Sequence, residues 1–140
     1  MMLSLYTLMP FSSKPLPLFL VIEDNEDYCS LLEWSYQKQA PACRLYFVRS
    51  AEEALRYLED CFIKPQLILL DYDLPGMDGL DFLEHLRHSS VWKNLPIILF
   101  TSREDSQLQT QAHSKGATRF ITKASGFLAM HAFWQQLLTA

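Results

Sequence analysis

Residues 67–79 have the sequence LILLDYDLPGMDG, and this stretch decides the fold. Four aliphatic residues in a row, without polar alternation, are typical of a strand that is buried on both faces of a parallel sheet. Asp71 ends the run, and a turn rich in glycine and proline follows it. After Gly79 the apolar residues Phe82 and Leu86 recur at helical spacing. The stretch therefore predicts a central strand, a loop and a helix in that order.

The same alternation of a short apolar run with an amphipathic stretch continues on both sides. Five βα units in succession predict an α/β fold, (βα)5, with a doubly wound five-stranded parallel sheet and helices on both faces. The other predicted strands are Leu18–Ile22, Leu45–Val48, Ile97–Phe100 and Phe120–Thr122, and the other predicted helices cover 25–39, a stretch from residue 50 onward, 105–115 and 126–138.

Composition excludes several classes of function. The 140 residues are 49% hydrophobic and 20% charged, as in a single globular domain. The net charge is −4 without a cluster of Lys and Arg, so nucleic-acid binding is not expected. No apolar run approaches the roughly 18 residues that a membrane span needs. The three cysteines form no C-x-x-C pair, so we expect reduced thiols in a cytoplasmic protein.

The first 17 residues differ from the rest of the chain. They are apolar, lack a basic start, and are interrupted by Pro10, Pro15 and Pro17. A secretory signal needs a basic segment and an unbroken apolar core. We therefore predict a poorly ordered leader at residues 1–17 and one domain at 18–140, with no separate output domain.

Polar residues stand at the ends of four predicted strands. Glu23 and Asp24 follow the first strand, Asp71 the third, Thr101 the fourth and Lys123 the fifth. Ligands of open parallel sheets bind beyond the carboxyl ends of the strands. Three acids, a hydroxyl and an ammonium are therefore expected at one edge of the sheet.

These residue types suit phosphoryl transfer. Clustered carboxylates repel one another unless a hard divalent cation such as Mg²⁺ lies among them. A carboxylate can attack phosphorus and form an aspartyl-phosphate. An ammonium and a metal ion would offset the charge of the phosphoryl oxygens, and a hydroxyl can donate a hydrogen bond to one of them.

Four motifs in this order resemble the receiver domains of two-component response regulators, the CheY-like family with a flavodoxin-like fold. The resemblance covers Leu18 to Leu138 and implies a stand-alone signalling domain of a phosphorelay. Its phosphoryl donor would be a histidine kinase or a phosphotransfer protein. Its own chemistry would be limited to self-phosphorylation and slow autodephosphorylation, so it would not be an enzyme. The motifs are FLVIEDN at 19–25, LILLDYDLPGMDG at 67–79, IILFTS at 97–102 and FITK at 120–123.

The resemblance also implies a metal site. Asp71 would be the phosphoacceptor and would bind one Mg²⁺ or Mn²⁺ together with Asp24. Glu23 would bind the same ion directly or through water. The backbone carbonyl of Asp73 would complete the protein's ligands.

Further roles follow from the same resemblance. Thr101 and Lys123 would contact the phosphoryl group, and Phe120 would occupy an aromatic switch position. Ser102 is small and would leave the site open to a donor. Asp73 and Arg103 occupy positions at which the family tunes the lifetime of the phosphate.

One position departs from the family pattern. The family usually has a proline after the lysine, often with a cis bond, whereas this chain has Ala124. A cis bond before a residue other than proline costs about 2.5–4 kcal/mol, so we expect a trans bond and a rearranged loop. Stand-alone regulators that partner phytochrome-type kinases also lack this proline and end in a helix with Phe-Trp, which resembles Phe133-Trp134.

The last helix carries a wide apolar stripe and no charged residue. Interface cores are depleted of charge and rich in aromatic residues and Met, so the stripe is interpreted as a partner surface. The alternative is a helix with a weakly polar exposed face. A homodimer or a docked partner is expected on the face made by the fourth helix, fifth strand and fifth helix. The stripe consists of Phe127, Met130, Phe133, Trp134, Leu137 and Leu138.

Two other functions stay open. DYDL after an apolar strand also resembles the start of haloacid-dehalogenase-type phosphatases, which however need a further acidic metal site after the lysine, and no acid follows Asp105. A receiver-like adaptor that acts without phosphorylation is the second alternative, because of Ala124. His85 and His88, three residues apart, are expected to lie on a solvated helix face rather than to bind zinc.

Overall fold

The computed structural model describes residues 16–38, 43–123 and 127–138. The predictions for most of the leader, residues 1–15, and for Ala124 lie outside this part of the chain. Strands and helices alternate throughout, as predicted. In chain order they are β1 (Leu18–Ile22), α2 (Glu26–Gln37), β2 (Arg44–Val48), α3 (Ala51–Glu59), β3 (Leu67–Asp71), α4 (Gly79–Arg87), β4 (Ile97–Thr101), α5 (Ser106–Ser114), β5 (Arg119–Thr122) and α6 (Phe127–Leu138).

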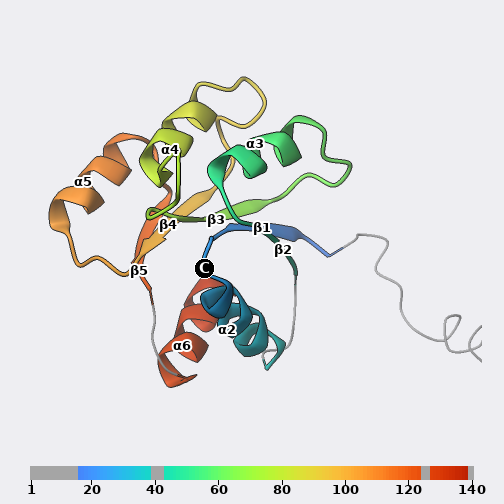
Figure 1. Ribbon diagram of the computed structural model, residues 1–140, viewed down its shortest axis with the longest axis vertical. Helices are drawn as coiled ribbons and strands as arrows, with labels where there is room; N and C mark the ends of the chain where they lie inside the picture. Colours follow the sequence, from blue (N-terminus) through green and yellow to red (C-terminus); the bar gives the residue numbers. More distant parts are fainter. Residues whose placement is uncertain (1–15, 39–42, 124–126, 139–140) are drawn as a thin grey trace, which may run out of the picture.

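The five strands form one parallel sheet in the order β2-β1-β3-β4-β5. Helices α2 and α6 cover one face of this sheet, and α3, α4 and α5 cover the other (Figure 1). The chain therefore leaves β1 and β3, the neighbouring central strands, toward opposite edges of the sheet. The doubly wound α/β fold of flavodoxin type is confirmed, and its topological switch point lies between β1 and β3.

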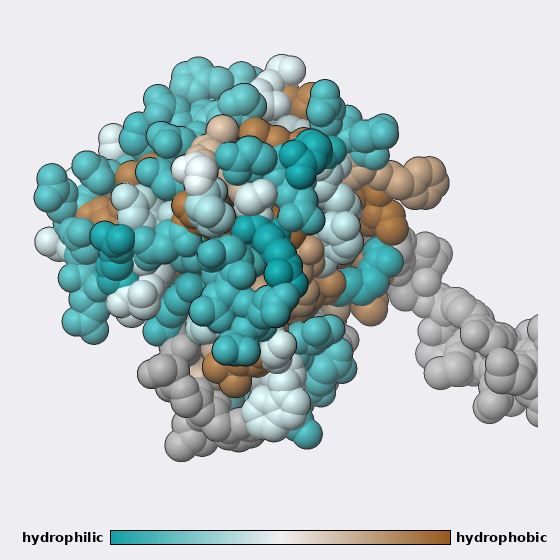
Figure 2. All heavy atoms as spheres, viewed as in Figure 1, coloured by the Kyte–Doolittle hydropathy of each residue, from teal (hydrophilic) through white to brown (hydrophobic). Residues whose placement is uncertain are grey.

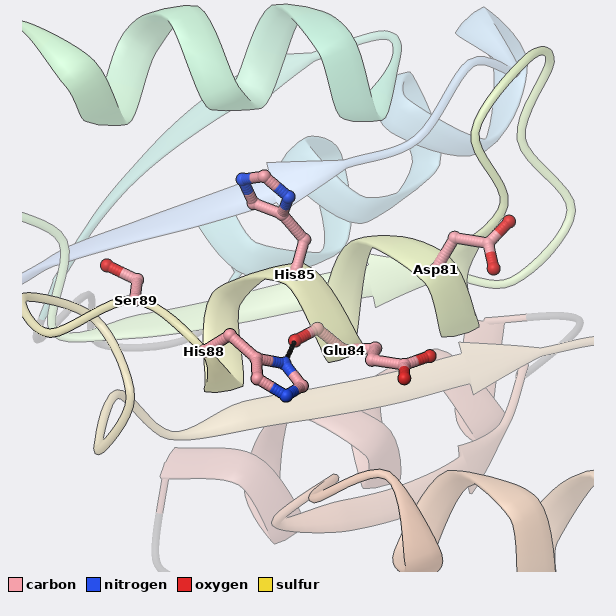
Figure 3. A pocket seen from close by; sticks show the side chains of 5 residues that line it. All are labelled: Asp81, Glu84, His85, His88 and Ser89. Atoms are coloured by element: carbon pink, nitrogen blue, oxygen red, sulfur yellow. Dashed lines mark hydrogen bonds between the residues drawn. The ribbon is translucent and has the colours of Figure 1, made fainter.

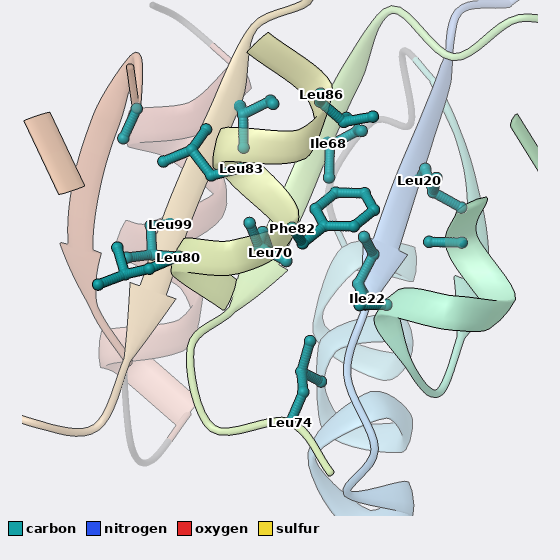
Figure 4. Close-up of a cluster of buried hydrophobic side chains, with 14 of the residues drawn as sticks. Leu20, Ile22, Ile68, Leu70, Leu74, Leu80, Phe82, Leu83, Leu86 and Leu99 are labelled. Carbon is teal, nitrogen blue, oxygen red and sulfur yellow. The ribbon is translucent and has the colours of Figure 1, made fainter. Parts of the chain in front are cut away.

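The central strands send alternate residues into two separate cores. In β3, Ile68 and Leu70 belong to the core under α3, α4 and α5, whereas Leu69 belongs to the core under α2 and α6. All three side chains are fully buried. Figure 4 shows Phe82 of α4 lying over the first of these cores. Burial on both faces explains why the run at 67–70 has no polar alternation.

Helix α6 is a core helix, and the predicted partner surface on its apolar stripe is wrong for the described side chains. These residues pack against α2 and the sheet and are at most 6% exposed. Both faces of a parallel sheet must be covered, and α6 covers one of them together with α2. The side chains of Phe127 and Leu138 lie outside the described part. The buried members are Met130, Phe133, Trp134 and Leu137.

Trp134 fixes α6 on α2. Its indole Nε1 donates to Ser35 Oγ at 2.8 Å and to the Leu32 carbonyl at 3.2 Å. Its ring also lies 5.0 Å from that of Tyr36. A fully buried indole N–H needs such an acceptor. The hydrogen bond from Trp134 therefore explains why the Ser35 hydroxyl is tolerated inside this core.

The loop between β3 and α4 is held at two points. Gly76 has a φ of +73°, which favours glycine, and the next residue, Met77, donates its N–H to Glu52 of α3 at 3.1 Å. At Gly79 a Cβ atom would lie 2.8 Å from the Asp71 carbonyl oxygen, so only glycine lets α4 start against the end of β3. The loop after Asp71 therefore has a defined course.

The surface on the side of α3, α4 and α5 is mainly hydrophilic, with apolar residues in small separate patches (Figure 2). None of the described helices is long and apolar enough to cross a membrane.

Candidate functional site

Three carboxylates meet at the switch point of the sheet. Glu23 and Asp24 directly follow β1, Asp71 ends β3, and these strands pair with Ile22 opposite Leu70. One oxygen atom of each acid lies within 4.8 Å of the others. Glu23 and Asp71 are each 1% exposed, whereas Asp24 is exposed. The structure thus brings together the acids that sequence analysis selected.

Lys123 reaches the same place from the end of β5. Its Nζ atom lies 2.5 Å from Glu23 Oε1 and 3.4 Å from Asp71 Oδ2. Its backbone N–H donates to the Thr101 carbonyl at 2.7 Å, which continues the pairing of β5 with β4. One ammonium therefore faces two buried carboxylates, and the cluster retains an excess of negative charge.

That excess changes the protonation of the site. Burial and, after it, the charge of Glu23 raise the pKa of Asp71 to about 7, even though Lys123 and the Asp73 N–H, 3.3 Å from Asp71 Oδ1, lower it in part. Two buried carboxylates with one ammonium are unfavourable when both are ionised. A divalent cation among them would remove this penalty.

The donor set fits Mg²⁺ or Mn²⁺. The carboxylates of Glu23, Asp24 and Asp71 supply hard oxygen ligands, and Glu23 Oε1, although paired with Lys123, accepts no well-formed hydrogen bond from the described residues. The acids border an open hollow of about 560 Å³, which leaves room for water ligands and for a phosphoryl group. The hollow is lined by Glu23, Asp24, Asn25, Glu26, Asp27, Asp71, Asp73, Ser102 and Lys123.

The Asp73 side chain has a role that sequence analysis did not predict. Arg103 binds it through Nη2 at 2.7 Å and Nε at 3.1 Å, and the fully buried Thr101 donates its hydroxyl to it at 3.4 Å. The Arg103 guanidinium also lies 5.3 Å from the Tyr72 ring. In this structure the Thr101 hydroxyl is therefore directed to Asp73. Asp73 and Arg103 each lie two residues beyond the end of a strand, and these strands, β3 and β4, are neighbours. That spacing of an acid and a base could have indicated the ion pair.

Phe120 lies on β5, opposite Leu99 of β4. Its side chain is half-buried and packs against the core under α3, α4 and α5. On its outer side it borders a pocket formed with the start of α5. The ring is therefore at the boundary between core and surface.

The two histidines of α4 do not converge. Figure 3 shows His85 and His88 pointing to opposite sides of the helix, and both are exposed. His88 Nδ1 lies 2.8 Å from the Glu84 carbonyl oxygen. Among the described residues, the acidic cluster at 23, 24 and 71 is the one group of three or more potential metal ligands. Both side chains are therefore exposed to solvent, as expected, but they lie on opposite sides of the helix and not on one face.

Comparison with known proteins gives a family. A family model described as response regulator receiver domain matches residues 19–133. The uncharacterized transcriptional regulatory protein YrkP of Bacillus subtilis (strain 168) is 32% identical over 113 residues, 81% of this chain and 46% of that protein. This chain thus spans less than half the length of that relative.

Solved structures share the fold. The Mn²⁺-bound form of response regulator Rcp1 has a TM-score of 0.78 at 20% identity, with 88% of this chain and 92% of that chain covered. The bacteriophytochrome response regulator AtBRR has a TM-score of 0.73 at 26% identity, with 91% and 96% covered.

Proposed function

This chain belongs to the response regulator receiver domains, and from that premise we propose that it accepts a phosphoryl group on Asp71. The donor would be the phosphohistidine of a histidine kinase or of a phosphotransfer protein. The observation that carries the proposal is the position of Asp71, buried at the end of β3 between an acid pair and Lys123. We assign the receiver domain to residues 18–140 and a leader to residues 1–17.

The transfer step follows from the positions of the side chains. An oxygen of the Asp71 carboxylate attacks phosphorus, the P–O bond forms as the P–N bond of phosphohistidine breaks, and the leaving imidazole keeps the electron pair. Lys123, 3.4 Å from Asp71 Oδ2, offsets charge on the phosphoryl oxygens. Thr101 exchanges its hydrogen bond to Asp73 for one to a phosphoryl oxygen. The open hollow beside Ser102 admits the donor.

The residues that would hold Mg²⁺ or Mn²⁺ are Asp24, Asp71, the carbonyl of Asp73, and Glu23 directly or through water. When bound, the ion neutralises negative charge among the carboxylates and the phosphoryl oxygens. Asp71 would then stay ionised and nucleophilic at neutral pH, although burial raises its pKa. The Mn²⁺-bound form of Rcp1, which has the same fold, supports this assignment.

Labelling tests the phosphoacceptor. The wild type is incubated with acetyl phosphate or phosphoramidate and Mg²⁺ and resolved on a Phos-tag gel, beside Asp71→Asn and the matched control Asp81→Asn on the exposed side of α4. The wild type and Asp81→Asn should shift, and Asp71→Asn should not. Undiminished labelling of Asp71→Asn would remove Asp71 from the role, and a wild type that no donor labels would remove the function.

The two other functions have less support. A haloacid-dehalogenase-type phosphatase needs a further acid after the lysine, and no Asp or Glu follows Asp105. A phosphorylation-independent adaptor would not need the acid cluster that faces Lys123. Steady hydrolysis of an aryl phosphate by the wild type would favour the phosphatase.

The partners are proposed more broadly. We place the protein in the cytoplasm, with a kinase of the phytochrome type as a candidate donor, because AtBRR is similar over most of both chains. The proposed output is a homodimer or docked partner on α5, β5 and the exposed side of α6, where Ala132, Gln135 and Gln136 lie, driven by Thr101 and Phe120. Sedimentation with and without phosphorylation tests the homodimer, and a protein monomeric in both states would leave only a heterologous partner.

A further inference from the structure

Two aromatic rings lie against the ammonium of Lys123. Its Nζ atom is 4.5 Å from the centroid of the Tyr28 ring and 5.3 Å from that of Phe100. We propose that these rings form a cradle for the ammonium and that Tyr28 is a positioning residue for phosphoryl transfer to Asp71. The inference rests on the proposed function and assigns a role to a residue outside the acid cluster.

The cradle is part of the framework of the site. Tyr28 lies in the first turn of α2, and its N–H donates to the side chain of the N-cap residue Asn25 at 2.9 Å. Phe100 is fully buried on β4, immediately before Thr101. The two rings contact each other with centroids 5.9 Å apart. Each ring is therefore fixed by an element that adjoins the acid pair or the hydroxyl of the site.

The surroundings of Lys123 make the rings important. Its side chain is 15% exposed, so water solvates the ammonium only in part. The carboxylates of Glu23 and Asp71 contact the ammonium, and the ring faces supply a second attraction. Cation–π attraction strengthens when the cation is desolvated.

A ring face has one property that another carboxylate would lack. It attracts the ammonium without offering an oxygen that would hold the N–H groups in a fixed direction. Lys123 lies closer to Glu23 than to Asp71, and it must move toward a phosphoryl group on Asp71. The Tyr28 ring can keep the ammonium in place while its hydrogen bonds are exchanged.

The test compares variants that keep or lose the ring face. Phosphorylation by phosphoramidate at saturating Mg²⁺ is measured for wild type, Tyr28→Phe and Tyr28→Leu. Phe82→Leu, in the core on the other side of the sheet, is the control for lost packing. Tyr28→Phe and Phe82→Leu should stay within about twofold of wild type, and Tyr28→Leu should be about tenfold slower, or about 1.4 kcal/mol.

A second series separates ring electronics from shape. Phenylalanine with none, one, two or three ring fluorines is incorporated at position 28, which weakens cation–π attraction stepwise with little change in volume. The rate should fall with each fluorine. Equal rates across this series, or equal rates for Tyr28→Leu and Tyr28→Phe, would overturn the positioning role. A wild type that is not labelled would overturn the proposed function itself, whereas a labelled wild type with an unaffected Tyr28→Leu variant overturns the cradle alone.

Discussion

Replacement of Asp71 by asparagine is expected to stabilise the metal-free protein at alkaline pH. Asp71 is 1% exposed, and burial followed by the charge of Glu23 raises its pKa to about 7, against about 3.9 for an ordinary aspartate. The folded protein therefore binds this proton more tightly than the unfolded chain. Between about pH 4 and 7 the free energy of unfolding falls as pH rises, and above pH 7 the full penalty is present.

The size of the penalty follows from the pKa. At 1.36 kcal/mol per pKa unit, a rise from about 3.9 to about 7 corresponds to about 4 kcal/mol. Water in the hollow above Asp71 screens part of this charge, and the asparagine amide needs a partner of its own, so about 2 kcal/mol is expected at pH 8. At pH 5 most of the folded protein already carries the proton. The advantage of asparagine should then shrink by more than half.

Urea denaturation in EDTA at pH 5 and pH 8 measures this effect for wild type, Asp71→Asn and the exposed control Asp81→Asn. Saturating Mg²⁺ should then stabilise wild type and Asp81→Asn more than Asp71→Asn, which lacks a charged ligand. An Asp71→Asn variant no more stable than wild type at pH 8 would show that the buried Asp71 carboxylate carries no such penalty. An equal difference between the two proteins at both pH values would show that its pKa is not raised.

Two further variants test the framework. Trp134→Phe removes the indole N–H that binds α2 and should lower the free energy of unfolding by about 1–3 kcal/mol in a urea titration. The control Trp34→Phe, at a residue that is 47% exposed, should leave this free energy nearly unchanged. Equal losses in the two variants would contradict the role given to the Trp134 hydrogen bond. Glu52→Ala leaves the Met77 N–H without its acceptor and loosens the loop that carries the Asp73 carbonyl. The Mg²⁺ affinity of this variant, measured by fluorescence titration, should therefore be lower than that of wild type and of the control Glu59→Ala. Unchanged affinity would show that the loop holds its course without Glu52.

The fold was predictable where burial decides it. The run at 67–70 is apolar throughout because both of its faces are covered, and its strand is where the sequence predicted it. The edge strand β2 was less well defined. It starts at Arg44, one residue before the predicted start, because the Arg44 N–H donates to the Pro17 carbonyl at 2.7 Å while its side chain is exposed. A backbone hydrogen bond sets this strand boundary, so the hydrophobic pattern of the sequence could not predict it.

The role of α6 could not be assigned from its own sequence. A helix without charge packs either on a partner or on the rest of its own chain, and composition does not distinguish them. The deciding contact is the hydrogen bond from Trp134 to Ser35, a residue 99 positions away. The same limit applies to Tyr28 and Arg103, because their contacts with Lys123 and Asp73 depend on side-chain directions across elements.

The contacts at the ends of β3 and β4 also limit the free energy that a change of partner by Thr101 would cost. Thr101 donates to Asp73, and Asp73 is held by Arg103 in an ion pair whose side chains are 41% and 56% exposed. Such an exposed pair contributes little to stability because water and salt screen it. In the proposed switch, Thr101 would exchange one acceptor for another when it turns to a phosphoryl group, so the hydroxyl itself would add little free energy. The driving force would then come from the charge of the phosphoryl group, and the packing of Phe120 against the core would set how far β5 can respond.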